Sequence, residues 1–173
     1  YINYWLTGEL WMEHGDASGT GWLDVRNRRW SPEMLAATDP DRDLGACLPP
    51  LVDAGTLVAI RPALADELGL PHPVQVSAGG GDNMMAAIGT GNVVPGVLSM
   101  SLGTSGTLFT YADRPVVDDA GRWAAFCDST GGWLPLICTM NCTVATEAVG
   151  RLCGFSTKEG DALLAGTRPG AEG

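Results

Sequence analysis

The pattern of hydrophobic and polar positions divides the 173-residue chain into two parts. In the first part, short apolar runs alternate with Gly, Pro and charged residues, which is typical of short helices joined by turns. The predicted helices are Tyr1–Leu6 ending at Gly8, His14–Thr20, a helix that starts at Ser31-Pro32-Glu33, and Ala63–Leu68 ending at Gly69.

A strand, a glycine turn and a helix are predicted next. Val74–Ser77 alternates apolar and polar residues and indicates a strand. The run Gly79–Gly81 indicates a tight turn, and the apolar segment Met84–Ile88 favours a helix. We therefore expect Asp82 and Asn83 at or near the helix N-terminus, where the functional residues of α/β proteins often lie.

The second part begins after the Gly- and Pro-rich segment Gly89–Gly96, which we interpret as a hinge. Apolar residues recur at helical spacing from Thr143 to Cys153, and Gly154 ends that run. We place a domain boundary at the hinge, so that residues 1–92 end one domain and residues 93–173 begin another. The predicted strands of the second part are Val97–Leu102, Thr107–Tyr111, Trp123–Cys127 and Trp133–Cys138.

Composition and charge narrow the classes of function. With 45% hydrophobic and 17% charged residues, the chain can bury a core, so a disordered chain is a poor interpretation. No apolar run is long enough to span a membrane. The formal net charge of −10 disfavours nucleic-acid binding, because such a surface repels phosphate backbones. An acidic enzyme can still bind ATP when Mg²⁺ and backbone N–H groups hold the phosphates.

The five cysteines are an odd number without a CxxC pair, which indicates reduced thiols in a cytoplasmic protein. Cys138 and Cys142 lie on a predicted strand end and turn, so we do not expect a metal site there. His14 and His72 are isolated in the sequence and are assigned no role. 

The segment from Ser77 to Asn83 is the first that suggests chemistry. Glycines let a ligand approach the backbone, and a carboxylate directly after them, Asp82, can point into a cleft. Asn83 offers donors and an acceptor, which suits a ligand with many hydroxyl groups. A plain turn with Asp82 as helix N-cap explains the same residues and stays open.

Asp16 is interpreted as a cap or surface carboxylate, and Asp128 as a turn residue.

A turn of small residues, Gly103-Thr104-Ser105-Gly106, is the second candidate. Such a turn between two strands presents successive N–H groups and two hydroxyl groups, which can bind phosphate oxygens. It is not a Walker A loop, because GxxxxGK[ST] is absent, and an ordinary hairpin turn is the alternative. A base on one side of a hinge and a phosphate turn on the other is the layout that phosphoryl transfer needs.

The run GGGDNMMAAIGTGNVVPGVLSMSLGTSGTLF resembles the centre of the FGGY family of carbohydrate kinases. Three further segments narrow the resemblance to the members that phosphorylate D-xylulose: YINYWLTGE, GDASGTGWLDVRNRRW and AAFCDSTGGWLPLICTMNCTVATE. The resemblance implies an α/β fold of the actin-like (ribonuclease H-like) class, with parts of two domains around a cleft. Residues 1–92 would end the sugar-binding domain, and residues 93–173 would begin the ATP-binding domain.

The same resemblance implies roles for individual residues. Asp82 matches the catalytic aspartate that removes a proton from the terminal hydroxyl of the sugar, and it would also contact the sugar, as would Asn83. Gly103 and Thr104 match a phosphate motif that faces the γ-phosphate of ATP, and Ser105 and Gly106 complete that turn. The implied reaction converts ATP and D-xylulose to ADP and D-xylulose 5-phosphate with Mg²⁺, in the cytoplasm.

Two motifs of the family are absent from this sequence: the Asp-Gly-Thr-Ser-type phosphate loop and the later Gly-rich adenosine motif. The chain also begins without Met and ends in a loop-like composition, so we expect an internal fragment that is inactive alone. A kinase for another sugar or polyol and a non-catalytic actin-like module remain alternatives. The oligomeric state is open, with a homodimer of the parent enzyme as one option.

Overall fold

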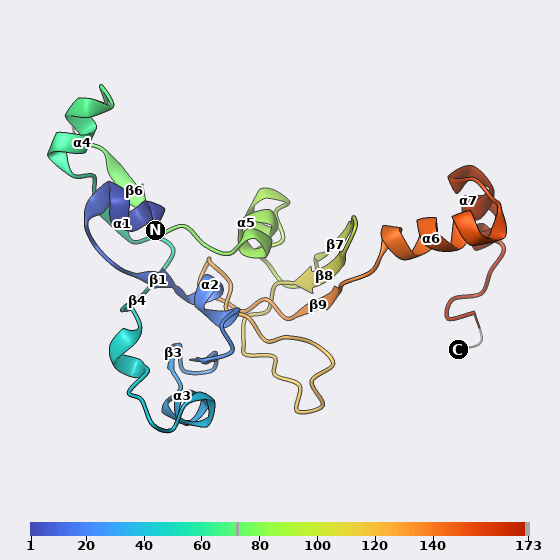
Figure 1. Ribbon diagram of the computed structural model, residues 1–173, viewed down its shortest axis with the longest axis horizontal. Helices are drawn as coiled ribbons and strands as arrows, with labels where there is room; N and C mark the ends of the chain where they lie inside the picture. Colours follow the sequence, from blue (N-terminus) through green and yellow to red (C-terminus); the bar gives the residue numbers. More distant parts are fainter. Residues whose placement is uncertain (72, 172–173) are drawn as a thin grey trace. The chain divides into compact units, whose positions relative to one another are not determined.

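The computed structural model describes residues 1–71 and 73–171, so His72 lies outside the described residues. The fold is mixed α/β (Figure 1). The helices are α1 (Ile2–Thr7), α2 (His14–Ser18), α3 (Pro32–Thr38), α4 (Pro62–Glu67), α5 (Asp82–Gly89), α6 (Thr143–Cys153) and α7 (Thr157–Ala165), with a 3-10 turn η1 (Gly45–Cys47). The strands are β1 (Met12–Glu13), β2 (Leu23–Asp24), β3 (Arg29–Trp30), β4 (Leu51–Val52), β5 (Leu57–Ala59), β6 (Gln75–Ser77), β7 (Leu98–Leu102), β8 (Gly106–Thr110) and β9 (Leu136–Thr139).

The strands form small sheets. β1 pairs with β4 in parallel, with Glu13 opposite Val52. β2 and β3 form an antiparallel hairpin, whereas β5 and β6 pair antiparallel with helix α4 between them in the chain. A three-stranded sheet has the order β7-β8-β9. The chain divides into two compact units: unit 1 holds residues 1–99 and 109–136, and unit 2 holds residues 100–108 and 137–173.

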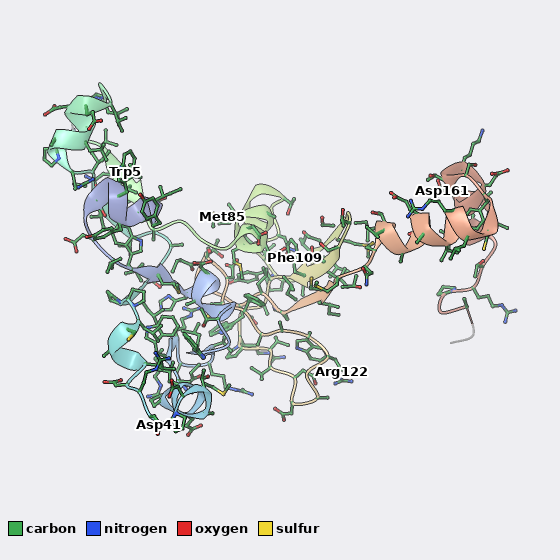
Figure 2. The ribbon with its side chains drawn as sticks, in the orientation of Figure 1. Trp5, Asp41, Met85, Phe109, Arg122 and Asp161 are labelled. Carbon is green, nitrogen blue, oxygen red and sulfur yellow. The ribbon has the colours of Figure 1, made fainter. Side chains whose placement is uncertain are left out.

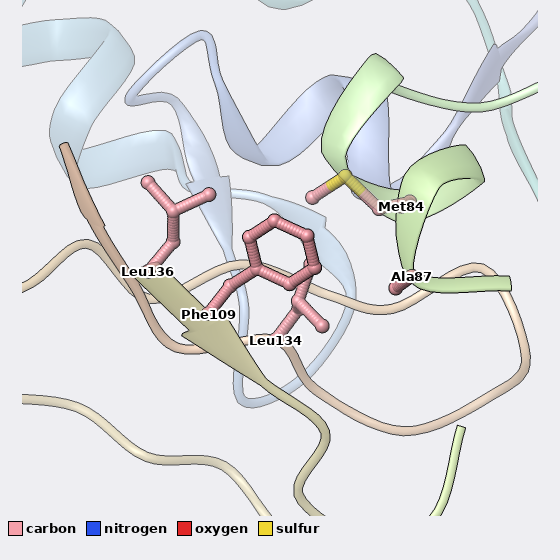
Figure 3. Packing of buried hydrophobic residues seen from close by; sticks show 5 residues of the cluster. All are labelled: Met84, Ala87, Phe109, Leu134 and Leu136. Atoms are coloured by element: carbon pink, nitrogen blue, oxygen red, sulfur yellow. The ribbon is translucent and has the colours of Figure 1, made fainter. Parts of the chain in front are cut away.

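One hydrophobic cluster of unit 1 is built on helix α5, the helix that begins at Asp82 (Figure 3). Met84 and Ala87 are 2% and 0% exposed, and they pack with Phe109, Leu134 and Leu136. Because Met84 and Ala87 are three positions apart, they lie on one face of the helix. This face fixes helix α5 to residues from much later in the chain.

Asn92 fixes the segment that follows helix α5. Its side chain is fully buried; Nδ2 donates to Ser99 Oγ at 3.0 Å and to the Phe109 carbonyl at 3.1 Å. Its Oδ1 accepts the N–H of Tyr111 at 3.0 Å. Since all these partners belong to unit 1, the segment interpreted as a hinge is bonded to that unit at Asn92. The boundary after residue 92 stays a prediction.

In unit 2, helices α6 and α7 pack around one aromatic ring. A Cβ placed on Gly150 would lie 3.3 Å from the Phe155 ring, and one placed on Gly160 would lie 3.0 Å from it. Glycine at both positions therefore lets the Phe155 ring lie close to the backbone of each helix.

Several helix ends are confirmed. Gly8 and Gly154 end α1 and α6 in the left-handed conformation, with φ of 83° and 73°. Ser31 caps α3 by accepting the N–H of Met34 at 3.2 Å. The interpretation of Asp16 as a cap is wrong: Glu13 is the N-cap of α2, and its side chain accepts the N–H of Asp16 at 3.1 Å.

The prediction of a continuous strand over Trp123–Cys127 is wrong as well. Isolated bridges join Ala124 to Leu136 and Cys127 to Trp133. Leu136 N–H donates to the Ala124 carbonyl at 2.9 Å and Leu134 N–H donates to the Phe126 carbonyl at 2.8 Å, so the two segments are joined by short bridges and not by a continuous strand. Helix α7 was not predicted, although its capping box of Ser156 and Glu159 can be recognised in the sequence.

Candidate active site

Asp82 is the first residue of helix α5, directly after the glycine turn that follows β6. The N-cap is Gly81, without a side-chain cap, so Asp82 does not take the N-cap position. Its side chain is exposed, and Oδ1 accepts the backbone N–H of Asn83 at 2.7 Å and the Asn83 Nδ2 at 3.2 Å. A carboxylate in the first turn is also favoured by the helix dipole.

The glycines before Asp82 are required by packing as well as by the turn. Gly79 has a φ of 78°, which favours glycine. A Cβ on Gly80 would lie 2.6 Å from both Met85 Cε and Ser129 Oγ. The sequence suggested that these glycines open the backbone to a ligand, but at Gly80 the space is filled by side chains of the chain itself.

A cavity of about 480 Å³ lies beside this turn within unit 1. This volume falls in the range of small-molecule sites, about 300–1,000 Å³. Its lining mixes polar and aromatic residues that include Asn3, Trp11, Glu13, Asp16, Ala78 and Gly80. Asp16 is exposed, as expected of a surface carboxylate, and it is also one of the residues that line this cavity.

The Gly103–Gly106 turn belongs to unit 2 and is built on the start of helix α6. Gly103 N–H donates to the Ser105 carbonyl at 2.9 Å, which closes the turn. The amides of Cys142 and Thr143 donate to the carbonyls of Thr104 and Gly103 at 2.9 and 3.0 Å. Thr104 and Ser105 are exposed, so their hydroxyl groups are accessible to a ligand.

Gly106 closes this turn in a place without room for a side chain. The residue is buried, and a Cβ there would lie 2.9 Å from Thr139 Cγ2 and 3.4 Å from Cys142. The turn is therefore held against β9 and the start of α6. Asp82 and Asn83 form one candidate group in unit 1, and Gly103–Gly106 form a second in unit 2.

A comparison with models of protein families shows to which family the chain belongs. The model of the FGGY family of carbohydrate kinases, N-terminal domain, matches residues 1–89, just over half of the chain. The chain belongs to the FGGY family of carbohydrate kinases. Asp82 lies inside the matched FGGY segment.

Curated members of the FGGY family are similar to this chain in sequence. The xylulose kinase of Haemophilus influenzae is 43% identical over the whole chain, which covers 35% of that protein. The xylulose kinase of Streptomyces coelicolor is 43% identical over 90% of the chain and 31% of its own length. The chain thus spans about a third of the length of the curated relatives that it matches.

Solved structures place the chain in the actin-like FGGY kinase fold, which confirms the expected fold class. A kinase from Brucella ovis, described as a xyloylose kinase, matches with a TM-score of 0.82 and 35% identity. That match covers 92% of this chain and 33% of the Brucella protein.

Metal-ligating side chains do not gather in the parts of the chain that the structure describes: no group of three or more His, Cys, Asp or Glu residues there could hold an ion. Among those residues there is also no helix that is both long and apolar enough to cross a membrane. The ionisable residue beside the Asp82 turn that the sequence did not indicate is Glu13. Its one sequence signal is its position three residues before Asp16, the spacing of a side-chain cap.

Proposed function

We propose that the full-length protein transfers the γ-phosphoryl group of ATP to the terminal hydroxyl of D-xylulose, giving D-xylulose 5-phosphate and ADP in pentose catabolism. The observation that carries this proposal is the 43% identity, over the whole chain, with a protein named xylulose kinase. Because the match covers the whole chain, both candidate groups, Asp82–Asn83 and Gly103–Gly106, lie within it.

In this proposal Asp82 is the general base. Its carboxylate takes the proton of the sugar hydroxyl as that oxygen forms a bond to the γ-phosphorus, and the bond to the β-phosphate oxygen breaks to release ADP. The exposed position of Asp82 at the start of a helix leaves the carboxylate accessible to a substrate. Asn83, which already donates to this carboxylate, would orient it and bind a neighbouring sugar hydroxyl.

The Gly103–Gly106 turn would bind the γ-phosphate. The amides of Cys142 and Thr143 are occupied by the turn's carbonyls, so the contacts would come from the exposed Thr104 and Ser105. Since the described residues hold no cluster of metal ligands, Mg²⁺ would be bound mainly through the phosphate oxygens, whose negative charge it neutralises. A cytoplasmic location is part of the proposal, because five free thiols suit a reducing compartment.

The test is Asp82→Asn in the full-length protein, assayed for ADP release with D-xylulose. Loss of a general base should lower kcat by about 10²–10⁴-fold, with folding retained. The control is Asp41→Asn, an exposed carboxylate in the loop after α3, labelled in Figure 2, which should keep full activity. An Asp82→Asn enzyme that keeps most of its kcat would refute the role of Asp82.

A panel of sugars tests the substrate separately. The unmodified protein should show its highest kcat/KM with D-xylulose among ketoses, polyols and sugar acids. A higher value with another sugar would assign a different substrate within the family. Absence of turnover with every sugar would favour a non-catalytic module.

A further inference from the structure

Three segments of unit 1 meet at the Glu13 side chain. Glu13 ends β1 and precedes helix α2, Gly80 belongs to the turn before Asp82, and Ser129 belongs to the segment before β9. Glu13 Oε2 lies 3.3 Å from the position of a Cβ on Gly80, and Ser129 Oγ lies 2.6 Å from the same position. The carboxylate therefore lies beside the turn that carries Asp82, at a point where the turn has no room for a side chain.

Burial makes this contact unusual for a carboxylate. Glu13 is 3% exposed, and carboxylates are rarely so buried without partners. Oε2 accepts the N–H of Asp16 at 3.1 Å and lies 2.9 Å from the position of a Cβ on Gly15. One oxygen thus caps helix α2 and touches the glycine turn at the same time.

The third segment is bonded to the same helix. The N–H of Cys127 donates to Ser18 Oγ at 2.9 Å, and the Cys127 carbonyl lies 3.1 Å from the position of a Cβ on Gly15. Cys127 is fully buried. The segment that carries Cys127 is therefore packed against helix α2, whose first turn is capped by Glu13.

Asp82 depends on this arrangement through its backbone. Its carboxylate is exposed and bonded to the next residue, Asn83, so its place in unit 1 is set by the turn before it and by the buried Met84 after it. A Cβ on Gly81 would lie 2.9 Å from Met84 Sδ and 3.8 Å from Asp16 Cα, so helix α2 lies against this turn too.

We propose that Glu13 is a positioning residue for the catalytic base: its buried carboxylate holds helix α2 against the Gly80–Gly81 turn and thereby fixes where Asp82 is presented. This inference rests on the proposed role of Asp82 as base. Positioning errors of about 1 Å can cost around 10²-fold in rate, so we expect substitutions of Glu13 to lower kcat.

The experiment compares three substitutions of Glu13 in the full-length protein. Glu13→Ala removes the contact and should lower kcat by about 10–100-fold, with the KM values for D-xylulose and ATP within about threefold. Glu13→Asp, one methylene shorter, should fold and also lose kcat, since its oxygen withdraws from Asp16 and Gly80. Glu13→Gln keeps length and one acceptor oxygen and should retain kcat within about threefold.

The matched control is Ser31→Ala, which also removes a side-chain cap, at helix α3. It should lower the melting temperature and leave kcat unchanged. Wild-type kcat in Glu13→Asp would overturn the inference, even if Glu13→Ala fails to fold. A raised KM for sugar with unchanged kcat would overturn it too, because it would place Glu13 in contact with substrate through the adjoining cavity. Activity in Asp82→Asn would instead refute the proposed base, whatever the Glu13 variants do.

Discussion

Replacement of Asn92 by Ala should be among the more damaging changes to unit 1. The substitution removes three hydrogen bonds inside the fold: those to Ser99 Oγ and the Phe109 carbonyl, and that from Tyr111 N–H. Ser99 retains Thr90 Oγ as a neighbour at 3.3 Å, so its loss is small. The Phe109 carbonyl and the Tyr111 amide lose these partners.

The magnitude follows from those two groups. Each buried polar group left without a partner costs about 1–3 kcal/mol. The free energy of unfolding of unit 1 should therefore fall by about 2–6 kcal/mol, against about 5–15 kcal/mol for a typical domain. With a urea m-value of about 2 kcal/mol/M, the midpoint should fall by roughly 1–3 M.

Urea unfolding and amide hydrogen exchange of the full-length protein measure this effect. Exchange at residues 109–111 should accelerate, because the Tyr111 N–H loses its acceptor. The matched control is Asn27→Ala, an exposed asparagine that donates to Asp24 at 2.7 Å, which should change stability by about 0.5 kcal/mol or less. If Asn92→Ala shifts the midpoint no more than Asn27→Ala does, the reasoning on buried partners is refuted.

Two further predictions concern the turn in unit 2 and the buried carboxylate. Gly106→Ala should raise the KM for ATP several-fold, because the new Cβ would lie 2.9 Å from Thr139 Cγ2. Adding Thr139→Ser removes that methyl group and should restore much of the lost affinity. A double variant with no recovery would contradict the proposed clash. Burial raises the pKa of Glu13 above its ordinary 4.5, so its ionisation destabilises the fold as pH rises past 4.5. Thermal melts should therefore show Glu13→Gln gaining stability relative to wild type as the pH rises from about 4.5 through the raised pKa of Glu13 in the folded protein, and parallel curves would contradict this sign.

Local signals predicted the elements well. Gly8 and Gly154 marked helix ends because a left-handed residue ends a helix without distant contacts. Asp82 was placed correctly at the start of α5 for the same reason, since strand, glycine turn and apolar helix lie within a few residues of it. The capping box at Ser156 was equally local and was overlooked.

Features that depend on distant residues were not predictable. Glu13 looks like an ordinary polar residue in the sequence, and its burial arises from Cys127 and Ser129, more than a hundred positions later. Asn92 lies in a segment of hinge-like composition, yet its amide is bonded to Ser99 of β7 and Phe109 of β8. The sequence placed Gly80 in a tight turn, but its close packing against Met85 and Ser129 can be seen only in the folded chain.

The burial of Cys127 makes the rate at which its thiol is modified a measure of local opening of the fold. Its thiol is fully buried, and burial raises its pKa, whereas Cys47, Cys138 and Cys153 are exposed. Only the thiolate is alkylated rapidly, so an electrophile at neutral pH should modify the exposed thiols first. Because Cys127 packs with Ala17 of α2 and Leu23 of β2, its modification requires this cluster to open, and its rate measures how often that opening occurs.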